Sequence, residues 1–256
     1  MVPFNLGLDP DNWMEERIRL FFDYCYPSVR HQSQKNFRWL VFFDNRTPKE
    51  FLDRISSSDS ARIIEFKFTD HWDKMDGEIL KILEGSKKKS NLIISTRLDC
   101  DDALSYKFIQ ILQQKVSQLG ISTPYALNCT YGIILDINSG VFHQKKMISN
   151  PFISMVQEFE HLDKSIFGLQ HQVISDQIIT HEIVEPKMWL QVVHGGNLLN
   201  KTSGFPLVNN LTREFNIKDP IFGGKIKPLV LVSEYIRYIK VRFNNAKYKI
   251  KKALGQ

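Results

Sequence analysis

Residues 91–102 read NLIISTRLDCDD, and the rest of the chain is organised around this stretch. It begins as a short apolar run, which predicts a buried strand, and it ends in Asp99, Asp101 and Asp102. A helical pattern follows directly and stops at Gly120. Its apolar positions are Leu104, Phe108, Leu112, Val116 and Leu119. The sequence therefore predicts a strand that carries acidic side chains at its C-terminal tip, where ligands bind in open α/β sheets.

The three aspartates allow two interpretations. Asp102 by itself would satisfy a helix N-cap, which leaves Asp99 and Asp101 over. Two carboxylates about 5 Å apart repel each other by about 3 kcal/mol at an effective dielectric constant of about 20. A divalent cation converts that repulsion into attraction, and oxygen ligands suit magnesium or manganese. The stretch is either a metal–phosphate site or a helix cap with spare charges.

The composition narrows the class of protein. With 256 residues, 43% hydrophobic and 24% charged, the chain can bury a sizeable core as a globular domain. Three cysteines, Cys25, Cys100 and Cys129, fit neither a disulfide framework nor a zinc site, which indicates a reducing compartment. No secretory signal and no apolar run of about 20 residues is present. We therefore expect a cytoplasmic protein, with the inner face of the membrane as the alternative location.

The first half of the chain alternates strands and helices. The predicted elements are the end of a strand at 1–3, a helix at 11–26 closed by Pro27, a strand at 37–43 tipped by Asp44, a helix at 48–55, a strand at 62–68 and a helix at 74–84. Such alternation predicts an α/β fold with a mainly parallel sheet flanked by helices.

The second half is less regular. The predicted elements are a hairpin of strands at 131–137 and 141–146, a helix at 150–163, a segment at 172–183 that reads equally as strand or helix, a strand at 188–193 followed by His194, and a long helix at 229–253. We predict one domain over residues 1–228 and a C-terminal helical tail over residues 229–256.

Five phrases in this order resemble a known family. They are LFFDYCYPSVRHQ, FRWLVFFDNRTP, STRLDCDDAL, NPFISMV and MWLQVVHGGN, all within residues 4–200. The layout resembles the putative rhamnosyltransferases, nucleotide-sugar-dependent glycosyltransferases of the GT-A fold, whose mixed, mainly parallel sheet is Rossmann-like. The resemblance implies a hexosyltransferase of polysaccharide biosynthesis. Its partners would be a nucleotide-sugar donor and a glycan or lipid-linked acceptor.

The resemblance also implies roles for individual residues. Asp99 and Asp101 match an Asp-x-Asp motif, in which Asp101 binds the metal (Mn²⁺ or Mg²⁺) and Asp99 lies near the metal or the donor ribose. Asp44 occupies the place where such enzymes hold the nucleotide base, and Asn5 lies close to the nucleotide. Arg97 would either bind the diphosphate or pair with a neighbouring aspartate.

Two further residues are weighed in the same way. His194 precedes two glycines, which let the backbone approach a ligand closely, so His194 would complete the metal site. The alternative is that His194 is an ordinary polar residue of the surface or the core. An inverting transfer needs a carboxylate base. The resemblance puts the base within residues 150–165, where the candidates are Glu158, Glu160 and Asp163. We predict Glu158; the alternative for each of the three is an ordinary charge on a helix surface. Gln157 stands where an acid is expected and puts turnover in doubt.

The formal charge of +6 is concentrated at the C-terminus. Residues 225–252 hold nine Lys or Arg and one acid, Glu234, a net charge of +8, so the remainder carries −2. In the predicted tail helix, apolar residues share one face with basic residues around it. The tail is therefore a basic amphipathic helix that contacts an anionic membrane surface, or a helix docked on the domain. Nucleic acid is not expected, because the body shows no aromatic platform or basic groove.

Three functions stay open on the sequence. The first is a metal-dependent, inverting glycosyltransferase. The second is a sugar nucleotidyltransferase, which also uses strand-tip acids and a metal and would release pyrophosphate. The third is a non-catalytic relative that binds a sugar or a protein without turnover.

Overall fold

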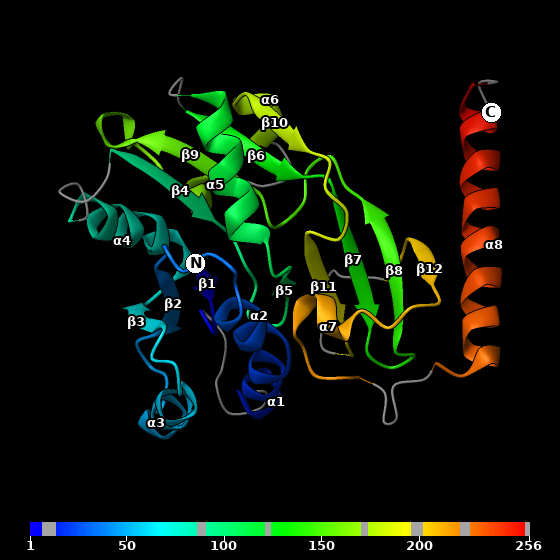
Figure 1. Ribbon diagram of the computed structural model, residues 1–256, viewed down its shortest axis with the longest axis horizontal. Helices are drawn as coiled ribbons and strands as arrows, with labels where there is room; N and C mark the ends of the chain where they lie inside the picture. The colour runs from blue at the N-terminus through cyan, green and yellow to red at the C-terminus, as the bar shows by residue number, and fades with distance from the viewer. Residues whose placement is uncertain are drawn as a thin grey trace.

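The computed structural model describes residues 1–6, 14–85, 91–120, 124–169, 174–195, 202–220 and 226–253. Within them the chain forms α/β structure with one parallel sheet, two mixed sheets and helices around them (Figure 1). The predicted α/β class is confirmed.

The N-terminal sheet is parallel and has the order β1-β2-β3. Its strands are β1 (Val2–Pro3), β2 (Trp39–Asp44) and β3 (Ile64–Thr69). A second sheet has the order β10-β6-β9-β4. Its strands are β4 (Leu92–Thr96), β6 (Tyr125–Cys129), β9 (Ser154–Glu158) and β10 (Thr180–Ile183). Strand β9 runs antiparallel to both of its neighbours.

Met1 joins these two sheets into one layer. Its amino nitrogen donates to the carbonyl of Thr96 at 2.9 Å, and its carbonyl accepts from the N–H of Leu98 at 3.1 Å. Strand β1 therefore lies between β2 and β4. The C-terminal ends of β1, β2 and β4 therefore lie at one edge of the layer. Asn5 follows β1, Asp44 is the last residue of β2, and Asp99 follows β4.

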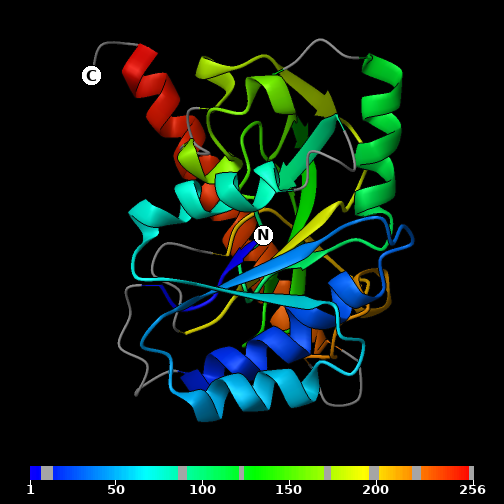
Figure 2. The same cartoon turned by 90° about the vertical axis from the view of Figure 1, so that its left-hand side faces the viewer.

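Helices cover both faces of this layer, as the alternation along β2 shows. Leu40 and Phe42 pack in a cluster with Met75 and Ile79 of α4 (Trp72–Glu84). The intervening Val41 packs in the main core, which also contains residues of α1 (Met14–Leu20) and of α5 (Phe108–Leu119). Helices α4 and α5 accordingly lie on opposite sides (Figure 2). Helix α3 (Lys49–Ser58) adds Ile55 to the main core.

The third sheet has the order β12-β8-β7-β11-β5. Its strands are β5 (Ala103–Leu104), β7 (Tyr131–Asp136), β8 (Val141–Lys146), β11 (Trp189–Val193) and β12 (Phe205–Leu207). The predicted hairpin and the strand before His194 are both confirmed. The short helix α7 (Thr212–Phe215) packs on this sheet through Phe215. The short helix α6 (Ile174–Gln177) and a 3₁₀ turn at Ile166–Gly168 pack with the second sheet, and a further 3₁₀ turn at Phe159–His161 follows β9.

The first helix differs from the prediction that Pro27 closes it. A π-helical turn (Phe21–Cys25) follows α1 and leads without a break into α2 (Tyr26–Arg30). Pro27 has no N–H to donate to the carbonyl of Asp23, and that carbonyl instead accepts from the N–H of Lys218 at 2.9 Å. A distant segment thus satisfies the group that Pro27 leaves open, so the helix continues.

One other element differs from its prediction. Residues 154–158 form strand β9 where a helix was predicted, because Met155 and Val156 are buried between β4 and β6. The predicted tail is helical, as α8 (Pro228–Ala253), and it stands beside β12 at one side of the molecule (Figure 1). The remaining strand and helix predictions agree with the structure to within a few residues, apart from 11–13 and 172–173, which lie outside the described residues.

Candidate functional site

The candidate site lies at the C-terminal edge of β2, β1 and β4. Strand β1 separates β2 from β4, so these two strands are about 10 Å apart, which is two strand spacings. Asp44 ends β2, and Asp99 follows β4. Asn5 follows β1 between them. The structure therefore brings the predicted donor-binding residues to one edge, as parallel strands require.

Asp44 and Asn5 are tied into the protein. The Asn5 side chain accepts from the backbone N–H of Asp44 at 3.1 Å and donates to Thr47 Oγ1 at 2.9 Å. Arg46 donates from Nε and Nη2 to the two carboxylate oxygens of Asp44, both at 2.8 Å. Asn5 is buried and Asp44 is almost entirely covered. Asn5 thus holds the β1 loop against the tip of β2, and the exposed guanidinium of Arg46 caps the Asp44 carboxylate.

Asp101 and His194 form a direct contact between an acid of the segment and a histidine. His194 Nε2 lies 3.0 Å from Asp101 Oδ2, and both side chains are largely buried. They meet because β5, directly after the acidic segment, pairs antiparallel with β11, directly before His194. The predicted proximity of His194 to the acids is therefore present in the structure. Gly196, the second glycine after it, lies outside the described residues.

The segment carries two more carboxyl groups, the half-buried Asp99 and the buried Asp102. Burial, reinforced by Asp101, raises the pKa of Asp99, while Arg97 and Arg17 oppose the rise. Burial raises the pKa of Asp102 well above its usual range. Asp102 Oδ1 accepts from the backbone N–H of Val192 at 2.8 Å, and within the described residues its Oδ2 makes no hydrogen bond.

The predicted role of Asp102 as a helix cap is wrong. Helix α5 begins only at Phe108, after strand β5, and its N-cap Lys107 makes no side-chain cap bond. The Asp102 carboxylate instead bonds Val192. The interpretation as a helix cap is therefore excluded. The carboxylates of the segment can interact with one another and with a bound cation.

Arg97 lies beside the acids. Its guanidinium carbon is 4.8 Å from the centre of the Phe167 ring, and its buried Nε has no hydrogen-bond partner in the described part of the chain. Burial lowers the pKa of Arg97, and Asp99 opposes that shift. Among the described residues, no ion pair joins Arg97 to a neighbouring aspartate. The alternative role, as a ligand of the diphosphate, stays a prediction.

One positioning contact was not foreseen. Arg17 of α1 donates from Nη1 to the carbonyl of Phe4 at 3.1 Å and to Cys100 Sγ at 2.7 Å. Cys100 is buried, and Arg17 thereby joins the acidic segment to the β1 loop. No local pattern in the sequence could have revealed this contact, because 83 positions separate Arg17 from Cys100.

Glu158 is not brought to this edge. It pairs with Leu92, at the beginning of β4, whereas the aspartates follow the end of β4 at Thr96. Four residues of strand separate these ends by about 13 Å. Glu158 lies 3.5 Å from His161 Nδ1 instead. The neighbouring Gln157 is buried. The predicted catalytic role of Glu158 therefore finds no support in its position.

The described residues supply at most part of a metal site. Among the described residues, no group of three or more His, Cys, Asp or Glu side chains converges to hold an ion. The Asp101–His194 pair nevertheless has suitable spacing, since neighbouring ligands of an octahedral ion at about 2.1 Å lie about 3 Å apart. Magnesium sites commonly use one or two carboxylates and complete their shell with phosphate and water. The donor set fits such a partial site.

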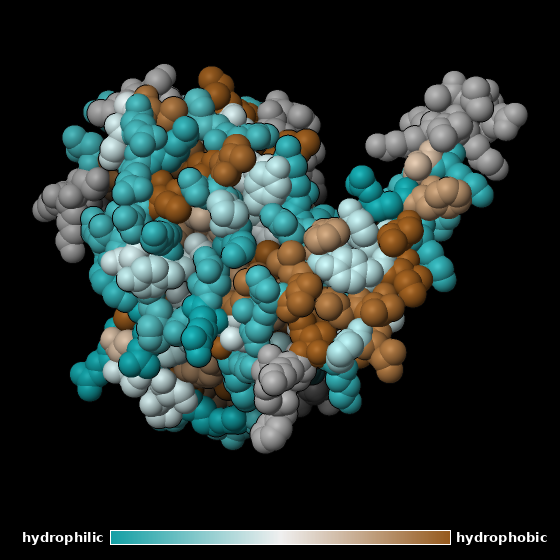
Figure 3. All heavy atoms as spheres, turned by 45° about the vertical axis from the view of Figure 1, so that its right-hand side comes forward, coloured by the Kyte–Doolittle hydropathy of each residue, from teal (hydrophilic) through white to brown (hydrophobic). Residues whose placement is uncertain are grey.

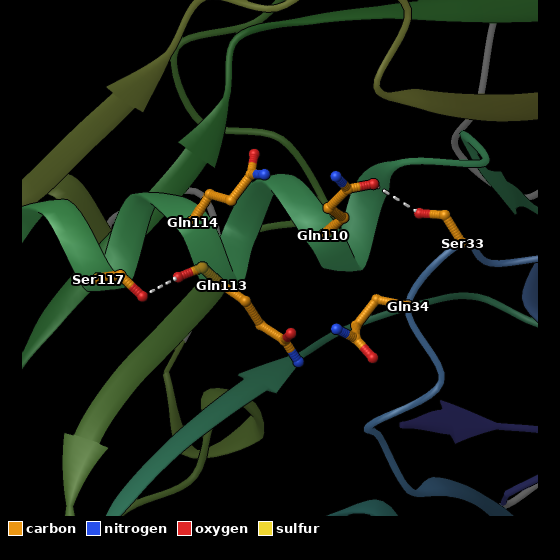
Figure 4. Close-up of a pocket in the computed structure, with 6 residues that line it drawn as sticks. All are labelled: Ser33, Gln34, Gln110, Gln113, Gln114 and Ser117. Atoms are coloured by element: carbon orange, nitrogen blue, oxygen red, sulfur yellow. Dashed lines mark hydrogen bonds between the residues drawn. The ribbon is translucent and has the colours of Figure 1, made fainter.

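A hollow of about 430 Å³ lies elsewhere, beside α5 (Figure 4). It is lined by Ser33, Gln34, Gln110, Gln113, Gln114 and Ser117. Amides and hydroxyls alone offer no charge to a diphosphate and no ring for a base to stack on, and none of the predicted site residues lines it. It is therefore a poor candidate for a nucleotide site.

Together the fold and the site define an α/β protein with a buried acid and histidine constellation at the ends of parallel strands. The family described as putative rhamnosyl transferase matches residues 8–204, and the chain belongs to that family. No curated protein matches the chain. In the described part, no helix is long and apolar enough to cross a membrane.

Proposed function

We propose that the chain is a metal-dependent glycosyltransferase of GT-A type, which moves a hexosyl group, rhamnose by the family's name, from a nucleotide-sugar donor to a glycan or lipid-linked acceptor. Membership of the family supports the reaction class. The observation that carries the site assignment is the 3.0 Å contact between Asp101 and His194 at the edge shared by Asn5 and Asp44. An inverting transfer is part of the proposal.

Asp101 and His194 would hold a Mn²⁺ or Mg²⁺ ion, with Asp99 beside them. When bound, the ion supplies positive charge to the diphosphate leaving group as the glycosidic bond breaks. Arg97, next to Asp99, would add a second positive charge to the same oxygens. Arg46 presents an exposed guanidinium at the place proposed for the nucleotide base.

The chain's own residues prepare this edge before any ligand binds. Asn5 fixes the β1 loop to the tip of β2, Arg17 fixes it to the acidic segment, and Asp102 fixes that segment to β11. A site held by packed strands loses little entropy when the donor binds. This rigidity is what a donor diphosphate and a metal would require.

The test is a screen of nucleotide sugars for manganese-dependent thermal stabilisation, followed by an assay of the released nucleotide. At a hundredfold excess over Kd, a donor should stabilise the protein by about 2.7 kcal/mol. The Asp101→Asn variant should lose this effect, because an amide does not offer the metal a charged oxygen. Asp53→Asn, at an exposed position in α3, is the matched control and should keep it.

The products distinguish the alternatives. Release of a nucleoside diphosphate supports the transferase, and release of pyrophosphate would indicate a nucleotidyltransferase. Manganese-dependent binding without turnover would indicate a non-catalytic relative, which the absence of Glu158 from the site favours as the second candidate. No manganese-dependent binding of any nucleotide would refute the proposal.

A further inference from the structure

An apolar stripe runs along the outer side of α8. It is formed by Val232, Ile236, Ile239 and Phe243, which are 53%, 49%, 62% and 62% exposed. Their spacing of four, three and four residues places them on one helical face. Figure 3 shows hydrophobic atoms gathered where this helix leaves the body and the helix projecting beyond them. Four large apolar side chains are thus exposed in a row.

The helix docks on the body through a different face. Glu234 lies 3.2 Å from the buried His143 Nε2 of β8, and the rings of Tyr235 and Tyr238 meet the ring of Phe205 edge to face, each at 5.5 Å. These contacts belong to the first three turns, and every residue from Ile239 to Tyr248 is exposed. The folded chain therefore leaves the stripe uncovered, while the fixed first turns hold the helix in place.

The charges of α8 are arranged around the stripe. At 100° per residue, Lys240 and Lys247 lie along one border and Arg242 along the other. The single acid of the helix is Glu234, which faces the body and pairs with His143 and Arg237. The stripe with its borders is therefore a surface of apolar and positive side chains without a negative charge.

A second copy of α8 is a poor occupant for the stripe. The four-three spacing would suit a coiled coil, in which the bordering residues of the two helices face each other. Here the borders are Lys240 and Lys247 on one side and Arg242 on the other, so a second copy would set cation against cation. Self-association through this face is opposed by its own charges.

We propose that α8 lies with this stripe on an anionic phospholipid surface. The apolar residues would enter the boundary between headgroups and acyl chains, and the lysine and arginine stems would extend sideways so that their charges meet lipid phosphates. This docking surface is independent of the proposed glycosyltransferase activity, because it uses none of the residues of that site.

Sedimentation of the full chain with lipid vesicles tests the proposal. The protein should sediment with vesicles that contain phosphatidylglycerol and remain in solution with pure phosphatidylcholine vesicles. About 1 M salt, where the Debye length is about 3 Å, should weaken the binding. Ile239→Asp should lower the affinity for anionic vesicles by about tenfold or more, because it places a carboxylate in the apolar stripe.

Val241→Asp is the matched control. Val241 is 50% exposed on the same helix, but it lies on nearly the opposite side from Ile239. The same added charge at this position should change the affinity for anionic vesicles by less than about twofold, since it stays outside the stripe. Circular dichroism checks that both variants keep the fold, which is expected because both positions are exposed.

Three results would overturn the proposal. The first is a failure to bind anionic vesicles, and the second is equal loss of binding in the two variants. The third is a stable dimer, detected by light scattering, that Ile239→Asp converts to monomers, because the stripe would then be covered by a second copy.

Discussion

The carboxylate of Asp102 accepts a hydrogen bond from the backbone N–H of Val192 at 2.8 Å, although 90 positions separate them in the sequence. Val192 belongs to β11, and His194 follows two residues later. The bond therefore helps to fix the distance between the acidic segment after β4 and the histidine that meets Asp101. It gives Asp102 a positioning role at the candidate site.

Replacing Asp102 tests this role directly. Asp102→Ala should lower the free energy of unfolding by about 1–3 kcal/mol, because it leaves a buried backbone N–H without its acceptor. Asp102→Asn keeps an oxygen at the same place and matches the neutral form that burial favours, so its stability should stay close to wild type. Urea denaturation measures both variants. Equal destabilisation of the two would mean that the charge of Asp102, and not its acceptor oxygen, stabilises the fold.

Gly132 is predicted to tolerate no side chain. A Cβ at this position would lie 2.0 Å from Cδ2 of Trp189. Trp189 is fully buried, stacked on Phe152 at 5.1 Å, and bonded through Nε1 to the carbonyl of Cys129 at 2.7 Å, so it has no room to move. Gly132→Ala should destabilise the protein by about 3 kcal/mol or more, measured by urea denaturation.

A second glycine supplies the control for that substitution. Nothing lies within 4 Å of a Cβ at Gly77, which is exposed within α4. Gly77→Ala should stabilise the protein by up to about 1 kcal/mol, because alanine favours the helix. Tolerance of alanine at both positions would contradict the tight packing of Trp189 on β7.

The docking of α8 should depend on pH through His143. Burial lowers the pKa of His143, and the bond to Glu234 opposes the shift only in part. The unfolded chain therefore takes up a proton near pH 6.5 that the folded protein still excludes. The stabilisation is complete above the unfolded pKa and is lost as the pH falls below it. Arg237, which also faces this group, acts in the same direction as burial.

This dependence can be measured by comparison with a variant. Between about pH 7.5 and pH 5.5, the unfolding free energy of the wild type should fall more than that of His143→Gln, which has no group that titrates there. Parallel losses in the two proteins would mean that His143 keeps its ordinary pKa in the folded state.

Glu158 should be dispensable for sugar transfer. It lies at the opposite end of β4 from the aspartates, so Glu158→Gln should change kcat by less than about twofold in an assay of released nucleotide. Loss of a true general base costs about 10²–10⁴ in rate. A loss of that size would show that Glu158 reaches the reacting hydroxyl after all, and that the acceptor binds at the other edge of the sheet.

Local patterns predicted most of the elements. The strand at 92–96 is an apolar run, the hairpin after Cys129 turns at Gly140 with φ of 70°, and α5 ends at Gly120 with φ of 74°. Each of these depends on residues close together in sequence. The α/β alternation followed from them, as did the position of Asp44 and Asp99 at strand ends.

Where the predicted secondary structure was wrong, a contact with a residue distant in sequence had determined the conformation. Pro27 did not end the first helix, because Lys218 bonds the carbonyl that Pro27 leaves open. Residues 154–158 became a strand because two neighbouring strands bury them, and that removed Glu158 from the site. The amphipathic pattern of residues 229–253 correctly predicted a helix, but it did not indicate which face of that helix packs on the body.

The sequence by itself determined the elements and the acidic strand tip, because backbone preferences and apolar spacing act over a few residues. Only the tertiary structure decided that His194 meets Asp101, that Asp102 holds β11 and that Glu158 lies elsewhere. Those outcomes depend on the pairing of β5 with β11 and of β4 with β9, which join residues 58 to 87 positions apart. Strand pairing uses backbone groups that every residue carries, so no short motif encodes the choice of partner.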